Sequence, residues 1–91
     1  MVSTATGDPE LGARLRSLRK DKGLALKAVA AAAGISLPFL SEIERGQKLP
    51  SLNVLSEVAA ALGVSVVELL RGLPRYENMA PGPNEGGEHS R

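Results

Sequence analysis

The side chains best suited to do chemistry lie in one short stretch, residues 34–46. Ser36 can cap a helix there by accepting a backbone N–H bond, and Gly46 can end it. At 3.6 residues per turn, one side of this helix is apolar and carries Phe39, Leu40 and Ile43. The other side carries Leu37, Pro38, Ser41 and Arg45, with Glu42 and Glu44 near the seams. Such a polar front can form hydrogen bonds with another molecule, and the shape is that of the second half of a helix-turn-helix.

Catalytic and metal-binding chemistry has little support in the sequence. The chain has no cysteine, and its single histidine, His89, lies in the C-terminal tail. These counts exclude a disulfide framework, a thiolate metal site and a histidine-based catalytic site in the domain. We therefore expect no catalytic residue, no metal and no cofactor. No long apolar run or signal-peptide pattern is present, so we expect a cytoplasmic protein that does not enter a membrane.

Five short helices are expected to position the stretch. Asp8 can cap the first helix, in which Leu11, Leu15 and Leu18 recur at helical spacing. The expected helices end at about Lys22, then span Leu26–Ala33 and Leu37–Arg45, then run from a Ser51 cap to Leu62, and finally span Val66–Arg71. The sequence thus predicts an all-α domain over residues 9–73, after a flexible leader at 1–8 and before a disordered tail at 74–91.

Charge is distributed unevenly along the chain. The net charge is only +1, but residues 10–48 hold eight basic side chains against four acids, and residues 49–91 hold three against five. The basic half coincides with the proposed helix-turn-helix, as a surface that binds a polyanion would require. The alternative is that these Arg and Lys side chains only keep the first helix soluble.

At this point the sequence resembles the Xre family, the phage-repressor/Cro type of helix-turn-helix regulator. The matching pieces are Leu15-Arg16-Ser17-Leu18-Arg19, Ala33-Gly34-Ile35-Ser36, Leu40-Ser41-Glu42-Ile43-Glu44-Arg45-Gly46 and Ala59-Ala60-Ala61-Leu62-Gly63-Val64. They occur in family order and at family spacing over residues 12–70. Residues 40–48 are also similar to actinobacterial Clp-gene regulators, from which Leu49-Pro50-Ser51-Leu52 departs. The resemblance implies a five-helix lambda-repressor-like domain.

The resemblance also implies which residues meet DNA, because the family's recognition helix places its first residues in the major groove. The implied base contacts are Leu37, Pro38, Ser41 and Glu42. The implied phosphate contacts are Arg14, Lys27, Arg45, Gln47 and Lys48. Glu42 is alternatively a solvated acid that contacts no base.

Two positions depart from the family pattern. The family opens its second helix with a Ser/Thr cap and a phosphate-binding Gln, whereas this chain has Ala25-Leu26. Lys27 or the amide groups of the helix N-terminus can replace part of that anchor. Phe39 stands where a Tyr is common, so we expect it to pack rather than contact DNA.

Two further sets of residues are assigned roles inside the protein. The family commonly pairs the residues that match Arg19 and Glu44, which implies an ion pair that ties the first helix to the third. A dimer surface is expected on the fifth helix, with Val66, Leu69, Leu70 and Leu73, and with Tyr76 as an extension. The alternative for these side chains is the core.

The leading hypothesis is a transcriptional regulator that binds double-stranded DNA at an inverted repeat as a homodimer. An autoregulating antitoxin or a restriction-modification controller is an alternative with the same fold. A protein-interaction adaptor is a second alternative, which the missing Gln at Leu26 favours and the basic half opposes. No ligand-binding domain is expected, so control would come through abundance, proteolysis or a regulatory protein partner.

Overall fold

A computed structural model describes residues 7–76, and within this range the chain forms helices and no strand. The helices are α1 (Pro9–Asp21), α2 (Leu26–Ala33), α3 (Leu37–Glu44), α4 (Leu52–Leu62), α5 (Val66–Leu70) and the 3-10 helix η1 (Pro74–Tyr76). The predicted all-α fold of five helices is confirmed. The predicted ends of the first, third and fifth helices differ from the observed ends by one residue.

Side-chain caps explain why four of the five helices begin where they do. The Asp8 carboxylate accepts from the amides of Glu10 and Leu11 at 3.1 and 3.2 Å. Ser36, Ser51 and Ser65 each accept from the amide three residues later, at 2.9–3.1 Å. α2 is the exception, because its N-cap Ala25 offers no side-chain acceptor. The amides at the start of α2 therefore have no side-chain cap.

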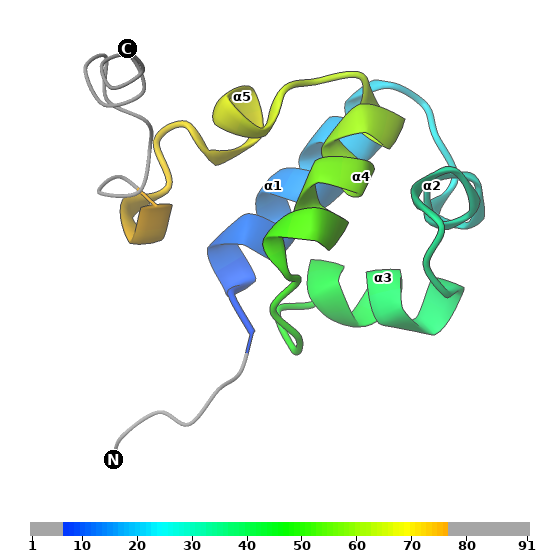
Figure 1. Cartoon of the computed structure of the whole chain (residues 1–91), viewed down its shortest axis with the longest axis horizontal. Coiled ribbons are helices and arrows are strands. Elements are labelled where there is room, and N and C mark those ends of the chain that lie inside the picture. Colours follow the sequence, from blue (N-terminus) through cyan, green and yellow to red (C-terminus); the bar gives the residue numbers. More distant parts are fainter. Residues whose placement is uncertain (1–6, 77–91) are drawn as a thin grey trace, which may run out of the picture.

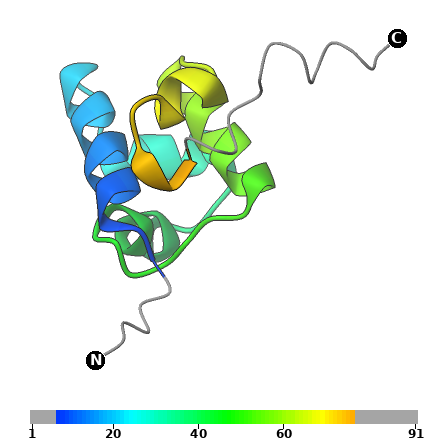
Figure 2. The ribbon, with the colours of Figure 1, turned by 90° about the vertical axis from the view of Figure 1, so that its left-hand side faces the viewer.

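The core is aliphatic and lies between helices that are far apart in sequence. α2 packs against α4, and α1 packs against α3 (Figure 1). Figure 2 shows α1 on one side of the domain and α4 with α5 on the other. The most deeply buried large side chains come from four of the five helices: Leu11, Leu15, Leu40, Ile43, Val58, Leu62 and Leu69.

α1 approaches α3 closely because Gly12 faces the end of that helix. A Cβ at this position would collide with the backbone carbonyls of Ile43 and Glu44. Gly12 is buried, as are its neighbours on the inner face, Leu11 and Leu15. A residue without a side chain is therefore what lets the backbones of the two helices meet.

The ends of the described chain differ from the prediction. Asp8 was placed in the flexible leader, but only 6% of it is exposed. Pro74–Tyr76 were placed in the disordered tail, whereas they form η1, and Tyr76 packs against the core. The contact of Tyr76 with the core could not be predicted, because residues 74–76 have the composition of the tail and show no helical periodicity. Residues 1–6 and 77–91, which hold the rest of the predicted leader and tail, lie outside the described residues.

Within residues 7–76, no single helix has the length and apolar composition needed to cross a membrane. One bent pair, α2 with α3, meets those two criteria when its helices are counted together. The apolar side chains Val29, Ala30, Leu40 and Ile43 of that pair are buried in the core.

Candidate nucleic-acid interface

α2 and α3 form a helix-turn-helix. Three residues, Gly34 to Ser36, separate the two helices, whose axes bend by 112° at this break. Gly34 adopts a left-handed conformation, with φ of 74°, which other residues adopt only at a cost. An angle of about 90–120° across a short glycine-containing turn is the geometry of this motif. α3 lies along the lower edge of the domain in Figure 1.

The two faces of α3 separate as the sequence predicts. Leu40 and Ile43 are 0% and 1% exposed and hold the helix to the core. Leu37 and Pro38 are exposed, whereas Ser41 and Glu42 are half-buried. The four side chains assigned to base contacts are thus accessible, with the first two more prominent. Phe39 is half-buried and packs against the core, as expected for a packing residue.

Ser41 and Arg45 are joined by a hydrogen bond that the sequence analysis did not anticipate. The Arg45 guanidinium donates through Nε to the Ser41 hydroxyl oxygen at 3.3 Å. The two residues lie four apart on one helix, and this spacing brings side chains together. Because Ser41 accepts this bond, its hydroxyl hydrogen remains able to donate. Any contact that Ser41 makes with a ligand therefore has a guanidinium beside it.

Four of the side chains assigned to phosphate contacts lie at exposed positions. Lys27 is exposed in the first turn of α2, and Arg45, Gln47 and Lys48 are exposed at and after the end of α3. The backbone amide of Gln47 donates to the Glu42 carbonyl at 2.8 Å, so it closes the helix and is not available to a ligand. The exposed side chains are the groups assigned to anion contact here.

Arg14 forms a hydrogen bond across the fold besides the phosphate contact that the sequence predicts. Its Nη1 donates to the carbonyl of Leu69 at 3.1 Å, across 55 residues of chain. It thereby holds the C-terminal end of α5 against α1. The sequence does not indicate this structural hydrogen bond, because it gives no sign that α5 ends beside α1, and the phosphate contact of Arg14 stays a prediction.

The expected pair between Arg19 and Glu44 is present and bidentate. Arg19 Nε lies 2.8 Å from Glu44 Oε2, and Nη2 donates to Oε1 at 3.0 Å. The third nitrogen, Nη1, donates to the Leu24 carbonyl at 3.0 Å. The side chains are 13% and 7% exposed. The hydrogen bond to Glu44 raises the pKa of Arg19 against the opposing effect of burial. Both charges are therefore committed inside the protein.

Two of the four residues assigned to a dimer surface belong to the core. Leu69 and Leu73 are 0% and 7% exposed within the single chain, so a second copy could barely touch them. Val66 and Leu70 are half-buried. The assignment of Leu69 and Leu73 is corrected to the core, where α5 packs against α4 and α1.

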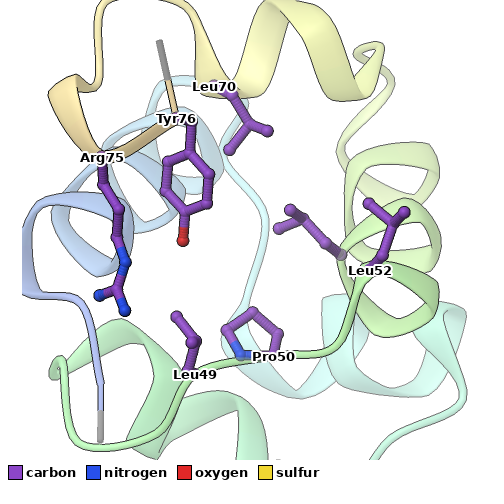
Figure 3. Close-up of a pocket in the computed structure, with 7 residues that line it drawn as sticks. Leu49, Pro50, Leu52, Leu70, Arg75 and Tyr76 are labelled. Carbon is purple, nitrogen blue, oxygen red and sulfur yellow. The ribbon is translucent and has the colours of Figure 1, made fainter. Parts of the chain in front are cut away.

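Other apolar side chains are exposed, and two of them, Leu49 and Leu52, line a groove. Leu49, Leu52 and Val67 are 41%, 70% and 46% exposed. The groove, of about 300 Å³, is lined by Leu49, Pro50, Leu52, Leu55, Leu70, Arg75 and Tyr76 (Figure 3). The sequence does not point to Leu52 at this groove, because its spacing places it on the apolar stripe expected to be buried, Leu52, Leu55, Val58, Ala59 and Leu62. Within residues 7–76, no cluster of His, Cys, Asp and Glu could hold a metal ion.

Comparison with known proteins also identifies a helix-turn-helix domain. Residues 10–71 match a helix-turn-helix domain family. The chain is 46% identical over 69 residues to the HTH-type transcriptional regulator DdrOP3 of Deinococcus deserti. That match covers 76% of this chain and 54% of DdrOP3, so this chain spans about half the length of that relative.

Two solved structures are similar in fold and sequence. The Clp gene regulator ClgR of Corynebacterium glutamicum has a TM-score of 0.65 and 48% identity, covering 68% of this chain and 80% of ClgR. The biofilm regulator SinR, solved in complex with DNA, has a TM-score of 0.62 and 44% identity, covering 66% of this chain and 97% of that one. The predicted lambda-repressor-like fold is confirmed. The chain belongs to the Xre family of helix-turn-helix DNA-binding transcriptional regulators.

Proposed function

We propose that the protein regulates transcription in the cytoplasm by binding an inverted-repeat DNA site as a homodimer. The observation that carries the proposal is the division of α3 into a buried back and an accessible front. Its back is fixed in the core by Leu40 and Ile43, and its front offers accessible apolar and polar side chains beside exposed cations. A helix fixed in this way can enter the major groove and present its first turns to base edges.

Base recognition is assigned to four side chains at the front of α3. Ser41 can donate to or accept from several base edges, and Glu42 can accept from cytosine N4. Leu37 can meet a thymine methyl, and Pro38 contributes shape. The Arg45 guanidinium bound to Ser41 also lies on this front, so we include it as a neighbour that restricts the orientation of the hydroxyl.

Phosphate binding is assigned to the predicted set, Arg14, Lys27, Arg45, Gln47 and Lys48. α2 adds a second source of positive potential, because no side chain caps its N-terminus at Ala25. Uncapped amides at a helix N-terminus favour an anion. Lys27 lies in that same first turn, so the two features support one phosphate contact in place of the family's missing Gln.

The dimer surface is assigned to the exposed apolar groove, with a second copy as its occupant. A two-fold interface is self-complementary, so it needs a projecting group and a recess on the same patch. Leu52, 70% exposed, projects beside a recess that its own chain forms with Leu49, Leu70 and Tyr76 (Figure 3). We infer that Leu52 of each copy enters the groove of the other, with Val66 and Val67 at the edge.

Selection of bound duplexes from a random pool tests the whole proposal. A two-fold dimer places its recognition helices about one DNA turn apart, so the enriched sequences should form an inverted repeat with half-sites about 10 bp apart. Ser41→Ala should change the preferred half-site, costing about 1–3 kcal/mol at the cognate base pair. Ser56→Ala, at an exposed position of α4, is the matched control and should select the parental sequence.

Each assigned surface has its own measurement within this test. Lys48→Gln and Arg14→Gln should each weaken binding to every duplex and flatten the salt dependence by about one unit. Leu52→Asp should shift the sedimentation of the protein toward the monomer. A pool without an enriched inverted repeat, together with a Ser41 variant that binds as the parent does, would leave the adaptor hypothesis in the lead.

A further inference from the structure

A buried acid joins the two ends of the described chain. Asp8 caps α1 through Oδ1, and its Oδ2 lies 3.8 Å from Nη1 of Arg75 on η1. The same Arg75 nitrogen donates to the Gly7 carbonyl at 3.5 Å. Tyr76 packs against the core, and burial together with the charge of Asp8 raises the pKa of its phenol. We refer to Asp8, Arg75 and Tyr76 as the Asp8 cluster.

The segment held by the Asp8 cluster lies directly on the turn after α3. A Cβ on Gly7 would collide with the Gly46 carbonyl and would lie 2.7 Å from the amide nitrogen of Lys48. On the other side of the contact, a Cβ on Gly46 would lie 2.8 Å from Cα of Pro9. Backbone therefore meets backbone here without a side chain between them, so a displacement of residues 7–9 must displace residues 46–48.

We propose that the Asp8 cluster positions the turn at residues 46–48, and with it the Gln47 and Lys48 side chains, for binding DNA phosphate. The inference rests on the proposed DNA-binding function and adds Asp8, Arg75 and Tyr76 as positioning residues. A contact between residues about 70 apart in sequence thereby bears on DNA affinity, although none of the three is assigned a contact with DNA. The α3 front, which is anchored separately by Leu40 and Ile43, keeps its sequence preference.

Asp8→Asn tests the proposal, because positioning of the turn and simple electrostatics predict opposite changes in DNA affinity. Asparagine caps a helix as well as aspartate does, so α1 should still begin at the same residue. Removing a negative charge should, by electrostatics alone, strengthen binding to a polyanion. Positioning predicts the reverse, a loss of about 3- to 10-fold in affinity, within the range for residues that touch neither ligand.

Glu10→Gln is the matched control, because Glu10 is exposed two residues away on the same helix. Affinity of the full chain is measured by fluorescence anisotropy with a labelled duplex of scrambled sequence, well below the melting temperature of each variant. Backbone amide resonances report the state of the turn. Weaker binding by the Asp8 variant, unchanged or stronger binding by the Glu10 variant, and shifted resonances of Gly46 and Lys48 are expected. Asp8→Asn that binds as tightly as Glu10→Gln would overturn the proposal.

Arg75→Gln supplies an independent variant, because its half-exposed side chain can be replaced without opening the core. A positioning role predicts weaker binding with an unchanged salt slope. A slope flattened by about one unit would instead make Arg75 a direct phosphate contact and would overturn its assignment here. Failure of the parent protein to bind any duplex is a separate outcome, which would reject the DNA-binding function itself.

Discussion

The domain is held together by two contacts of opposite chemistry. The apolar contact joins α2 to α4 through small and branched side chains, including Ala30, Ala33, Val58 and Leu62, all at most 5% exposed. The polar contact joins residues 7–19 to α3 and to η1 through the Arg19–Glu44 pair and Asp8, and the close backbone approach at Gly12 lies between them. Both contacts position the helix-turn-helix: the apolar one fixes α2, and the polar one adds to the burial of Leu40 and Ile43 that holds α3.

This difference indicates how each contact should respond to mutation. An apolar contact can lose a few methyl groups and partly collapse, so its losses are graded. A polar contact depends on individual atoms, and a buried charge that loses its partner has no substitute. We therefore expect the polar contact to be sensitive to small changes and the apolar contact to depend on volume.

Gly12→Val should have the largest effect of all. The added side chain would collide with the carbonyls of Ile43 and Glu44, which belong to backbone and cannot rotate away. We expect a loss in unfolding free energy above the usual 1–3 kcal/mol for overpacking, at about 4 kcal/mol or complete unfolding. Urea denaturation measures it. The control Ala13→Val, on the exposed side of the same helix, should lose less than about 1 kcal/mol. Equal losses in the two variants would show that α1 and α3 can separate freely.

Leu62→Ala should reveal the graded response of the apolar contact. Leu62 is 2% exposed, and its truncation should lower the unfolding free energy by about 2–5 kcal/mol, depending on how far the cavity collapses. Ser56→Ala, exposed on the same helix, should stay within about 0.5 kcal/mol of the parent. A loss below 1 kcal/mol for Leu62→Ala would mean that α4 repacks without cost, and the contrast between the two contacts would fail.

Arg19→Ala and Glu44→Ala should each cost about 1–4 kcal/mol, because each leaves a buried charge without its partner. Arg19→Ala should cost more, since it also removes the donor to the Leu24 carbonyl. The double variant should lose less than the sum of the single ones. Strictly additive losses in urea denaturation would contradict an interaction between the two side chains.

The apolar contact could be predicted from the sequence almost completely, and the polar contact only in part. The spacing of Leu52, Leu55, Val58, Ala59 and Leu62 predicts a buried stripe without knowledge of what covers it. Four of the five are buried and α4 ends at Leu62 as expected, but the prediction is wrong for Leu52, which is 70% exposed. Periodicity suffices here because the hydrophobic effect depends on buried area and has no preferred direction.

A polar contact needs a specific partner, and the spacing of residues along the sequence does not predict which distant residue that partner is. Arg19 and Glu44 were paired only because the family resemblance supplied the partner. Arg14 was assigned to phosphate, and its hydrogen bond to the Leu69 carbonyl had no such guide. Asp8 and Arg75 are 67 positions apart, and no local pattern predicts that they meet. Leu69 was misassigned for the same reason, because its cover comes from elements whose position the sequence does not give.

Titration of Tyr76 tests the polar contact with the smallest perturbation. Burial raises the pKa of Tyr76, and the charge of Asp8 raises it further, against a smaller opposite effect of Arg75. The folded protein therefore holds the phenolic proton more tightly than the unfolded chain, whose tyrosine titrates at about 10. The stability linked to Tyr76 should be complete below that pH and should be lost as the pH rises through the folded-state pKa.

Because Tyr76 is the only tyrosine and tryptophan is absent, tyrosinate absorbance follows this group alone. Its midpoint should lie above the midpoint in denaturant, and Asp8→Asn should reduce the difference without removing it, since burial is the larger cause. Lysines titrate in the same range, so the pH dependence of unfolding is compared with that of Tyr76→Phe, which should lose this component. Coincident midpoints in the folded and denatured protein would show that η1 does not hold Tyr76 beside Asp8 in solution.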